Sequence, residues 1–293
     1  MSIWVHHAIG EVPSIGEIAG LQCRFCDGVL VKVQIEDRWV GVPITLPYLH
    51  QQTVIEMAET HGDFILRELE IVDEPDERPA FLCICPLCGW WHVSKEIYLR
   101  TRNQTWFVEY GVAASLRKFD QVDIRLPANE VRQYLIANYE HRYNVHPRRF
   151  EEVVASVFSS FGFKAEVTAY SGDGGIDVII RNYQNQAIAV QVKRHKGTIE
   201  VSSVRELLGA MVLNGYTKGA FVTTSRFQAG GMETMNQALS RGLCIDLIDG
   251  ESFLKKLRIA QMNDFMRYPQ LISSSIIDAL ELELGNELHC RAL

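Results

Sequence analysis

Two stretches decide the fold of this chain: SGDGGIDV at residues 171–178 and AVQVK at residues 189–193. The first is a tight, glycine-rich turn that delivers Asp177 to the start of a predicted strand. The second forms the partner strand of a hairpin. Side chains alternate along a strand, so Gln191 and Lys193 share one face. Because a hairpin places the start of its first strand opposite the end of its second, we expect Asp177 beside Gln191 and Lys193.

The elements around this hairpin follow from the spacing of apolar residues. Pro147 suits the first position of a helix and Gly162 its end. Between them, apolar residues recur at helical spacing at Phe150, Val153, Val154, Val157, Phe158 and Phe161. Further elements are predicted in the order strand 163–170, strand 175–182, strand 186–193, helix 201–214, strand 217–224, helix 228–241, strand 243–248 and a short helix from Gly250. This order predicts an α/β fold, with an α-β-β-β-α-β core and a mixed central sheet.

The three polar side chains of the hairpin suit phosphodiester hydrolysis with a divalent cation. Such a cation polarises the phosphate and lowers the pKa of the attacking water. Mg²⁺ prefers oxygen ligands, which the Asp177 carboxylate, the Gln191 amide and the main-chain carbonyl of Val192 offer. Lys193 would orient the water and offset developing charge. The alternative is structural: an aspartate in a turn and a lysine at a strand end are common in loops and at sheet edges.

Several blocks of sequence, in order, resemble the Mrr-type restriction endonuclease domain. They are RFEEVV (149–154), GF (162–163), SGDGGID (171–177), VQVKR (190–194), VRELLGA (204–210), KGAFVTTS (218–225) and LIDG (247–250). That family belongs to the PD-(D/E)xK nuclease superfamily. The resemblance therefore implies a restriction-endonuclease-like fold over residues 147–257 and metal-dependent cleavage of DNA.

The resemblance also implies roles for individual residues. Asp177 matches the catalytic aspartate that binds Mg²⁺ or Mn²⁺, Gln191 a second metal ligand, and Lys193 the catalytic lysine. Gln191 departs from the acidic residue usual in the superfamily but agrees with this family's own variant. A helix glutamate of the family falls on Glu151, which we expect to compensate for the missing charge. Glu152 is the alternative helix carboxylate.

The N-terminal part carries two Cys-x-x-Cys pairs. The chain has seven cysteines, and this odd number favours metal binding over a disulfide framework. Each pair offers two thiolates to one ion, and the glycine that follows it permits a tight turn. We expect a zinc-ribbon-like site for structural Zn²⁺ with the ligands Cys23, Cys26, Cys85 and Cys88. Buried free cysteines are the alternative, and Cys83 or His92 remain possible replacement ligands.

The 293 residues suffice for two domains. Strands are predicted at 29–35 and 64–72 and a helix at 51–62. Residues 112–142 show a helical tendency, and within them Pro127 is the expected start of a helix. The predicted organisation is a zinc-ribbon-containing α+β domain (1–110), a helical connector (111–146), the nuclease domain (147–257) and a C-terminal helical extension (258–293), a packing or dimerisation element.

The net charge of −7 argues against a protein that coats nucleic acid without specificity, because such binding depends on phosphate neutralisation. Nucleic-acid contact would then be local, at Arg142, Arg148 and Arg149 or along residues 193–196. Tryptophans of the N-terminal part, at positions 39, 90, 91 and 106, would stack on a base or pack in a core. With no signal sequence and no apolar run of membrane-spanning length, we expect a cytoplasmic protein.

These patterns together predict an Mg²⁺-dependent endodeoxyribonuclease. By analogy with the family, its role would be prokaryotic defence against foreign or modified DNA. Symmetric cutting of both strands would need at least a homodimer, and a partner protein of a defence system is the other option. Two alternatives differ in class: a zinc-ribbon nucleic-acid-binding or regulatory module with an inactive nuclease fold, and an RNA-directed effector nuclease.

Overall fold

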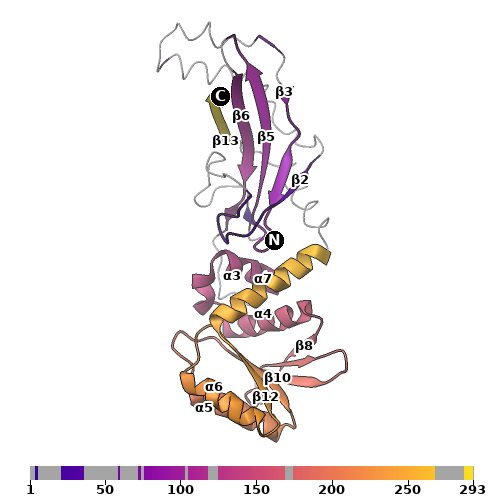
Figure 1. The fold of residues 1–293 in the computed structure, drawn as a ribbon, viewed down its shortest axis with the longest axis vertical. Helices are drawn as coiled ribbons and strands as arrows, with labels where there is room; N and C mark the ends of the chain where they lie inside the picture. The colour runs from indigo at the N-terminus through magenta and orange to yellow at the C-terminus, as the bar shows by residue number, and fades with distance from the viewer. Residues whose placement is uncertain are drawn as a thin grey trace. The chain divides into compact units, whose positions relative to one another are not determined.

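The structure is a computed structural model (Figure 1) that describes residues 4–5, 21–35, 59, 72–73, 76–102, 105–117, 125–168, 174–267 and 287–292. The chain divides into two compact units. Unit 1 comprises Met1–Lys118 and Tyr268–Leu293, and unit 2 comprises Phe119–Arg267. None of the helices within the described ranges has the length and hydrophobicity needed to cross a bilayer.

Unit 2 is built on a mixed five-stranded sheet. Its strands are β8 (Lys164–Val167), β9 (Val178–Arg181), β10 (Ala187–Lys193), β11 (Lys218–Thr223) and β12 (Cys244–Ile248). The order across the sheet is β12-β11-β10-β9-β8. β10, β11 and β12 run parallel, whereas β8 pairs with β9 and β9 with β10 in antiparallel fashion. The predicted α/β fold with a mixed central sheet is confirmed.

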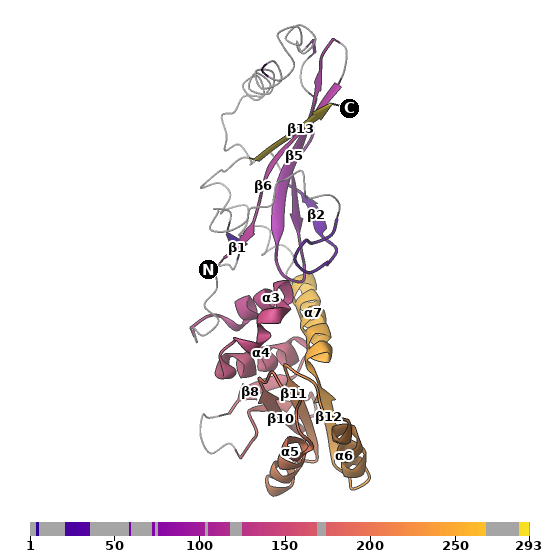
Figure 2. The same ribbon diagram turned by 90° about the vertical axis from the view of Figure 1, so that its left-hand side faces the viewer.

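Helices cover both faces of this sheet. They are α3 (Ala128–Ala137), α4 (Pro147–Ser160), α5 (Val201–Leu213), α6 (Ala229–Leu239) and α7 (Gly250–Arg267), with a 3₁₀ turn at Tyr139–Tyr143. α5 and α6 pack together on one face (Figure 1), and α4 packs on the other face with α3 and α7 against it (Figure 2). Unit 2 is therefore a three-layer sandwich.

The first helix of the predicted core forms for the reasons that its sequence suggests. Pro147 occupies the first turn of α4, and His146 Nδ1 accepts a hydrogen bond from Arg148 N at 3.2 Å. Gly162, just beyond the helix, has a φ of +92°, a conformation that favours glycine. The apolar stripe is buried over most of its length, with Phe150 at 1 % exposure, whereas Phe158 and Phe161 at its end are half-buried. The predicted helix from Pro147 to Gly162 is confirmed.

Unit 1 is an antiparallel β structure over its described residues. Its larger sheet has the order β13-β6-β5-β4-β2, with β3 paired to β5. The strands are β2 (Val31–Gln34), β3 (Asp76–Glu77), β4 (Phe81–Ile84), β5 (Trp91–Arg100), β6 (Thr105–Ala113) and β13 (Glu287–Ala292). A separate pair joins β1 (Trp4–Val5) to β7 (Ser115–Leu116).

Two predicted segments differ from the structure. The helical connector at 111–146 begins instead with the end of β6 and with β7, and its helix α3 starts after Pro127 as expected. Of the predicted helical extension at 258–293, the described residues to Arg267 belong to α7, Glu287–Ala292 is a strand that pairs with β6, and residues 268–286 lie outside the described residues. Pairing with a distant strand overrides local helical periodicity there. The predicted helix at 51–62, apart from Glu59, and nearly all of the strand at 64–72 lie outside the described residues.

Candidate functional site

A glycine turn brings Asp177 to the sheet. Gly174 and Gly175 have φ values of +59° and +86°, which only glycine adopts readily. The turn leads directly into Asp177, just before β9. Asp177 N donates to Val190 O at 2.9 Å, and the Asp177 carboxylate accepts a hydrogen bond from Val192 N at 2.6 Å. These two contacts with β10 lie on either side of Gln191, so the structure brings Asp177 and Gln191 together as the hairpin predicts.

Gln191 carries an unusual polar atom. Its Oε1 is buried and has no hydrogen-bond partner among the residues that the structure describes. Gly175 lies beside this amide: a Cβ there would lie 3.8 Å from Gln191 Nε2, an ordinary van der Waals distance. A buried carbonyl oxygen without a partner costs about 1–3 kcal/mol, so this atom is suited to accept a hydrogen bond from water or to bind an ion. An amide oxygen beside a carboxylate fits the ligand preference of Mg²⁺ or Mn²⁺.

Lys193 is the last residue of β10, two positions after Gln191 and at the end of the strand away from the hairpin turn. Its Nζ donates to Ser203 Oγ at 3.0 Å, in the first turn of α5, and Ser203 is buried. Thr223 Oγ1 on β11 donates to the Lys193 carbonyl at 2.8 Å. The ammonium is therefore held at the end of β10 by a neutral hydroxyl, which leaves its positive charge available for a phosphate. Ser203 has no motif of its own, and the sequence alone did not indicate it.

Glu151 on α4 reaches the site through an arginine. Its carboxylate accepts from Arg148 Nη1 at 3.0 Å, and the same nitrogen donates to Thr168 O at 2.7 Å. Thr168 in turn hydrogen-bonds the Asp177 carbonyl through both its N and its Oγ1. Glu151 is thus linked to the main chain of Asp177 with its charge balanced by Arg148. Glu152, the alternative, forms an ion pair with Arg149.

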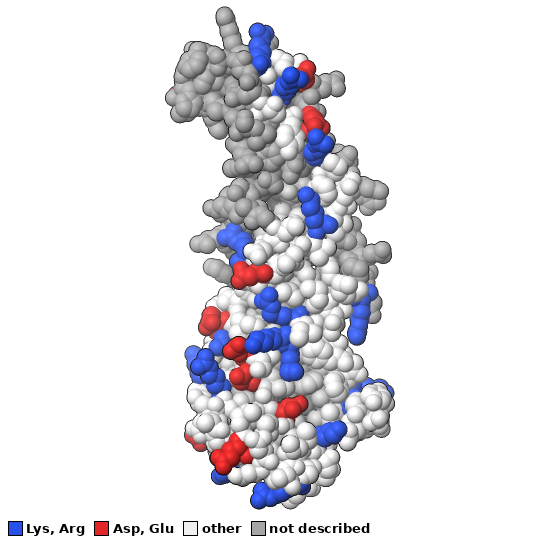
Figure 3. Space-filling view, in the orientation of Figure 1, with Lys and Arg blue, Asp and Glu red and all other residues white. Residues whose placement is uncertain are grey.

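The first basic patch that the sequence indicates is engaged within the fold. Arg148 and Arg149 pair with glutamates three residues further along α4. Arg142 donates to Thr224 O at 3.0 Å and to Tyr139 O at 3.0 Å. On the face of unit 2 seen in Figure 3, basic and acidic side chains are interspersed. These three arginines therefore have partners within unit 2, and their contact with nucleic acid stays a prediction.

The comparison with protein families bears on this domain directly. Residues 142–257 match the model of the Mrr_cat family, described as restriction endonuclease. The resemblance to the Mrr type is confirmed. The Mrr-type domain spans α4 through the first half of α7 and includes Asp177, Gln191 and Lys193. A comparison with curated proteins finds no match.

Solved structures that resemble the chain share little sequence with it. One is the ATP-dependent Type ISP restriction-modification enzyme LlaBIII bound to DNA, with 14 % identity, a TM-score of 0.32, and coverage of 45 % of this chain and 8 % of that one. Another is an EndoMS–dsDNA2 complex, with 12 % identity, a TM-score of 0.27, and coverage of 75 % of this chain and 97 % of that one. A third is a repair endonuclease from Pyrococcus abyssi, with 11 % identity, a TM-score of 0.25, and coverage of 75 % of this chain and 99 % of that one. This chain thus spans only 8 % of the length of the LlaBIII chain.

In unit 1, the two Cys-x-x-Cys pairs form matching turns. Cys23 O accepts from Asp27 N and Cys85 O from Gly89 N, both at 2.9 Å. The residue after each second cysteine is left-handed, with φ of 56° at Asp27 and 79° at Gly89. In the first turn the left-handed residue is therefore the aspartate rather than the glycine that follows it. Gly28 is needed for space: a Cβ there would lie 2.9 Å from Leu87 Cδ1 and 3.2 Å from Cys85 Sγ.

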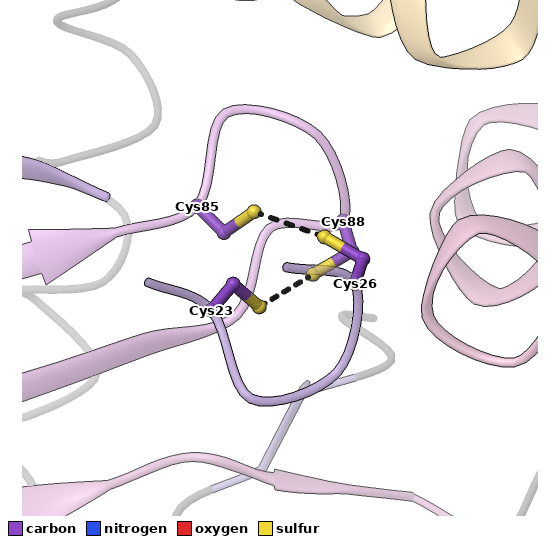
Figure 4. A group of neighbouring side chains, drawn as sticks. All are labelled: Cys23, Cys26, Cys85 and Cys88. Carbon is purple, nitrogen blue, oxygen red and sulfur yellow. Dashed lines mark hydrogen bonds between the residues drawn. The ribbon is translucent and has the colours of Figure 1, made fainter. Parts of the chain in front are cut away.

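The four thiols converge (Figure 4). Cys23 Sγ lies 3.5 Å from Cys88 Sγ, Cys26 Sγ lies 3.5 Å from Cys85 Sγ, and all four sulfurs are within 4.8 Å of one another. Tetrahedral Zn²⁺ with Zn–S bonds of about 2.3 Å places its sulfurs about 3.8 Å apart. The four thiols also compete for protons. Hydrogen bonds from Cys23, Cys26 and Cys88 lower the pKa of Cys85. Hydrogen bonds with Cys23, Cys26 and Cys85 raise the pKa of Cys88. A cation bound by four thiolates removes this competition, so the group fits Zn²⁺.

The neighbours of the cysteine group are core residues. Cys83 and His92 face each other across β4 and β5, are buried, and do not belong to the four-sulfur group. Trp90 and Trp91 are 0 % and 4 % exposed, and Trp90 Nε1 donates to Ala114 O at 2.8 Å. These two tryptophans therefore pack in the core and offer no face for base stacking. Trp39 and the side chain of Trp106 lie outside the described residues.

Proposed function

We propose that this protein is a metal-dependent endonuclease that hydrolyses DNA phosphodiester bonds. One observation carries the proposal: the Asp177 carboxylate is fixed against β10 beside the buried Oε1 of Gln191, which has no hydrogen-bond partner within the described part of the chain. The carboxylate of Asp177 and the amide oxygen of Gln191 would supply two ligands to a divalent cation near Lys193. The remaining coordination positions of the cation would then be open to water and to a phosphate oxygen. The match to a restriction endonuclease family supports the same reaction class.

Each side chain has a distinct task in this reaction. Asp177 and Gln191 would hold Mg²⁺ or Mn²⁺, which when bound polarises the phosphate and acidifies a water. Lys193, oriented by Ser203, places its ammonium to offset charge on the phosphate oxygens. Glu151, balanced by Arg148, positions the turn that carries Asp177 through Thr168. Asp177, Lys193 and Glu151 are thus assigned different roles that separate variants can test.

We further propose that unit 1 holds one structural Zn²⁺ through Cys23, Cys26, Cys85 and Cys88, and that this part recognises DNA or a partner that licenses cutting. The division into a zinc-holding part in unit 1 and a nuclease domain at residues 147–257 in unit 2 is part of the same proposal. The family supports a role in defence against foreign or modified DNA, acting as a dimer where both strands are cut.

The test is cleavage by the full chain, offered supercoiled plasmid, modified and unmodified phage DNA, and RNA side by side. We expect nicking of DNA with Mg²⁺ or Mn²⁺, none with EDTA, and none in Lys193→Met, which retains the length of the side chain without its charge. Binding of DNA without cutting under every metal condition would instead identify a regulatory module with an inactive nuclease fold. Cutting confined to RNA would identify an effector ribonuclease.

A further inference from the structure

Two surface loops run side by side beyond the carboxyl ends of β10 and β11. His195 N and O both hydrogen-bond Thr224 Oγ1 at 2.9 Å, and Ser225 Oγ donates to Lys196 O at 3.3 Å. Ile199 N donates to Arg226 O at 2.7 Å. The connection continues as an isolated parallel bridge between Ile199 and Phe227. Hydrogen bonds therefore join residues 194–199 to residues 224–228 along the length of both loops.

Three basic side chains of these two hydrogen-bonded loops are exposed to solvent. His195, Lys196 and Arg226, here called the basic rim, are all exposed. Across the residues that the structure describes, no ion pair engages any of the three, in contrast to the arginines of α4. The acidic residue that follows the first loop is Glu200, whose carboxylate accepts a hydrogen bond from Ser202 Oγ at 3.3 Å. Lys196 and Arg226 of the basic rim thus present cations on a rigid support, with no ion pair among the described residues.

The basic rim also adjoins the candidate active site. His195 and Lys196 follow Lys193 in the chain, and Lys193 pairs with Thr223 at the end of β11, three residues before Arg226. A chain with a net charge of −7 must gain its affinity for a polyanion from local cations. Contacts to phosphate position a protein on DNA without reading its sequence. A rigid row of cations beside the catalytic lysine is what such positioning needs.

We propose that the basic rim binds the phosphates of the DNA backbone that flank the bond to be cut. This inference rests on the proposed nuclease function and adds the surface that holds the substrate. Each phosphate neutralised releases condensed counterions, which makes binding depend on salt concentration. Lys196 and Arg226 supply the permanent charges, and both come from loops that cannot easily move apart.

The test uses the full chain and a short fluorescent DNA duplex, with Ca²⁺ in place of Mg²⁺ to separate binding from cutting. In Lys196→Glu/Arg226→Glu we expect affinity to fall about tenfold or more, and the slope of log affinity against log salt to shrink by about 0.9 for each phosphate that is no longer neutralised. Nicking should show a raised KM with kcat little changed. Lys218→Glu is the matched control, an exposed lysine at the opposite end of β11.

The outcomes separate this inference from the nuclease function. If the double variant folds, as judged by thermal unfolding, and binds the duplex with the affinity and salt slope of the wild type, the basic rim is not a DNA surface even where nicking is intact. An equal loss of affinity in Lys218→Glu would also overturn it, because the effect would then be that of net charge. A wild-type chain that neither binds nor cuts DNA overturns both proposals.

Discussion

A single substitution can distinguish the two interactions proposed for the Asp177 carboxylate, one with the main chain and one with a metal ion. Its carboxylate accepts a hydrogen bond from Val192 N and, in the proposed reaction, binds the cation. Asp177→Asn keeps an oxygen for Val192 N but removes the charge. Since a metal ion contributes several kcal/mol to transition-state stabilisation, we expect plasmid nicking to slow by roughly 100-fold or more with little change in Tm. Nicking by this variant at the wild-type rate would remove Asp177 from the site.

Ser203 offers a second test at the scale of single residues. Without its hydroxyl, the Lys193 ammonium loses the acceptor that orients it. Hydrogen bonds to charged groups contribute about 1.5–3 kcal/mol, so Ser203→Ala should lower kcat about tenfold with KM nearly unchanged. Ser203→Thr should recover part of the rate. Ser202→Ala, one residue away and exposed, is the control; an equal effect there would argue for a general change in α5.

His92 makes the stability of unit 1 depend on pH. It is 6 % exposed, and burial, followed by the nearby charge of Lys32, lowers its pKa from 6.5 to about 4. The folded state therefore binds this proton more weakly than the unfolded state, and stability is lost as pH falls from about 6.5 to 4. The full loss is about 3 kcal/mol. Urea unfolding at pH 7 and pH 4.5 should show a smaller difference in His92→Leu, and an unchanged difference would contradict this origin.

Sequence patterns predict which polar residues lie in the site better than they predict the contacts between those residues. Strand alternation places Asp177, Gln191 and Lys193 together, because both strands are adjacent in the chain. The link from Lys193 to Ser203 depends on how α5 crosses the sheet, which no local pattern encodes. Arg148 and Arg149 resemble a free basic patch, yet the RRFEE spacing already pairs each with a glutamate three residues on.

At the scale of elements, two glycines of unit 2 should respond in opposite directions to the same substitution. Gly250 begins α7, and a Cβ there would lie 2.5 Å from the main-chain oxygen of Thr224. Gly209 lies inside α5 with nothing within 4 Å of the added atom. We expect Gly250→Ala to destabilise by about 1–3 kcal/mol or more, and Gly209→Ala to stabilise by roughly 0.5–1 kcal/mol. Chemical unfolding measures both, and the same sign for the two variants would contradict the packing described.

The elements of unit 2 follow from sequence more closely than those of unit 1. In unit 2, neighbouring elements in the chain are neighbours in space, and each shows a clear period; α5, expected at 201–214, forms at Val201–Leu213. In unit 1, the long strands β5 and β6 were not expected, and β13 joins β6 from the far end of the chain. Such pairings depend on interactions between distant residues, and β propensity depends strongly on that context.

At the scale of the whole molecule, the two units should respond separately to loss of metal. The cysteine group joins residues 23–26 to residues 85–88 within unit 1, whereas unit 2 has its own core around α5, including Leu207, Met211 and Phe221. Binding of structural Zn²⁺ contributes about 10–16 kcal/mol in small zinc domains, where it is linked directly to folding. Without the ion, unit 1 would lose the connection between its two turns.

We therefore expect Cys88→Ser to lose one equivalent of zinc and to lower the unfolding temperature of one calorimetric transition, while the transition of unit 2 stays in place. Cys244→Ser is the matched control, since Cys244 is an exposed cysteine of unit 2. It should retain the zinc and leave the transition of unit 1 unchanged. Zinc content well below one per chain in the wild type would contradict the four-sulfur site. A shift of both transitions in Cys88→Ser would show that the units unfold as one, because only shared stability transmits the effect from one unit to the other.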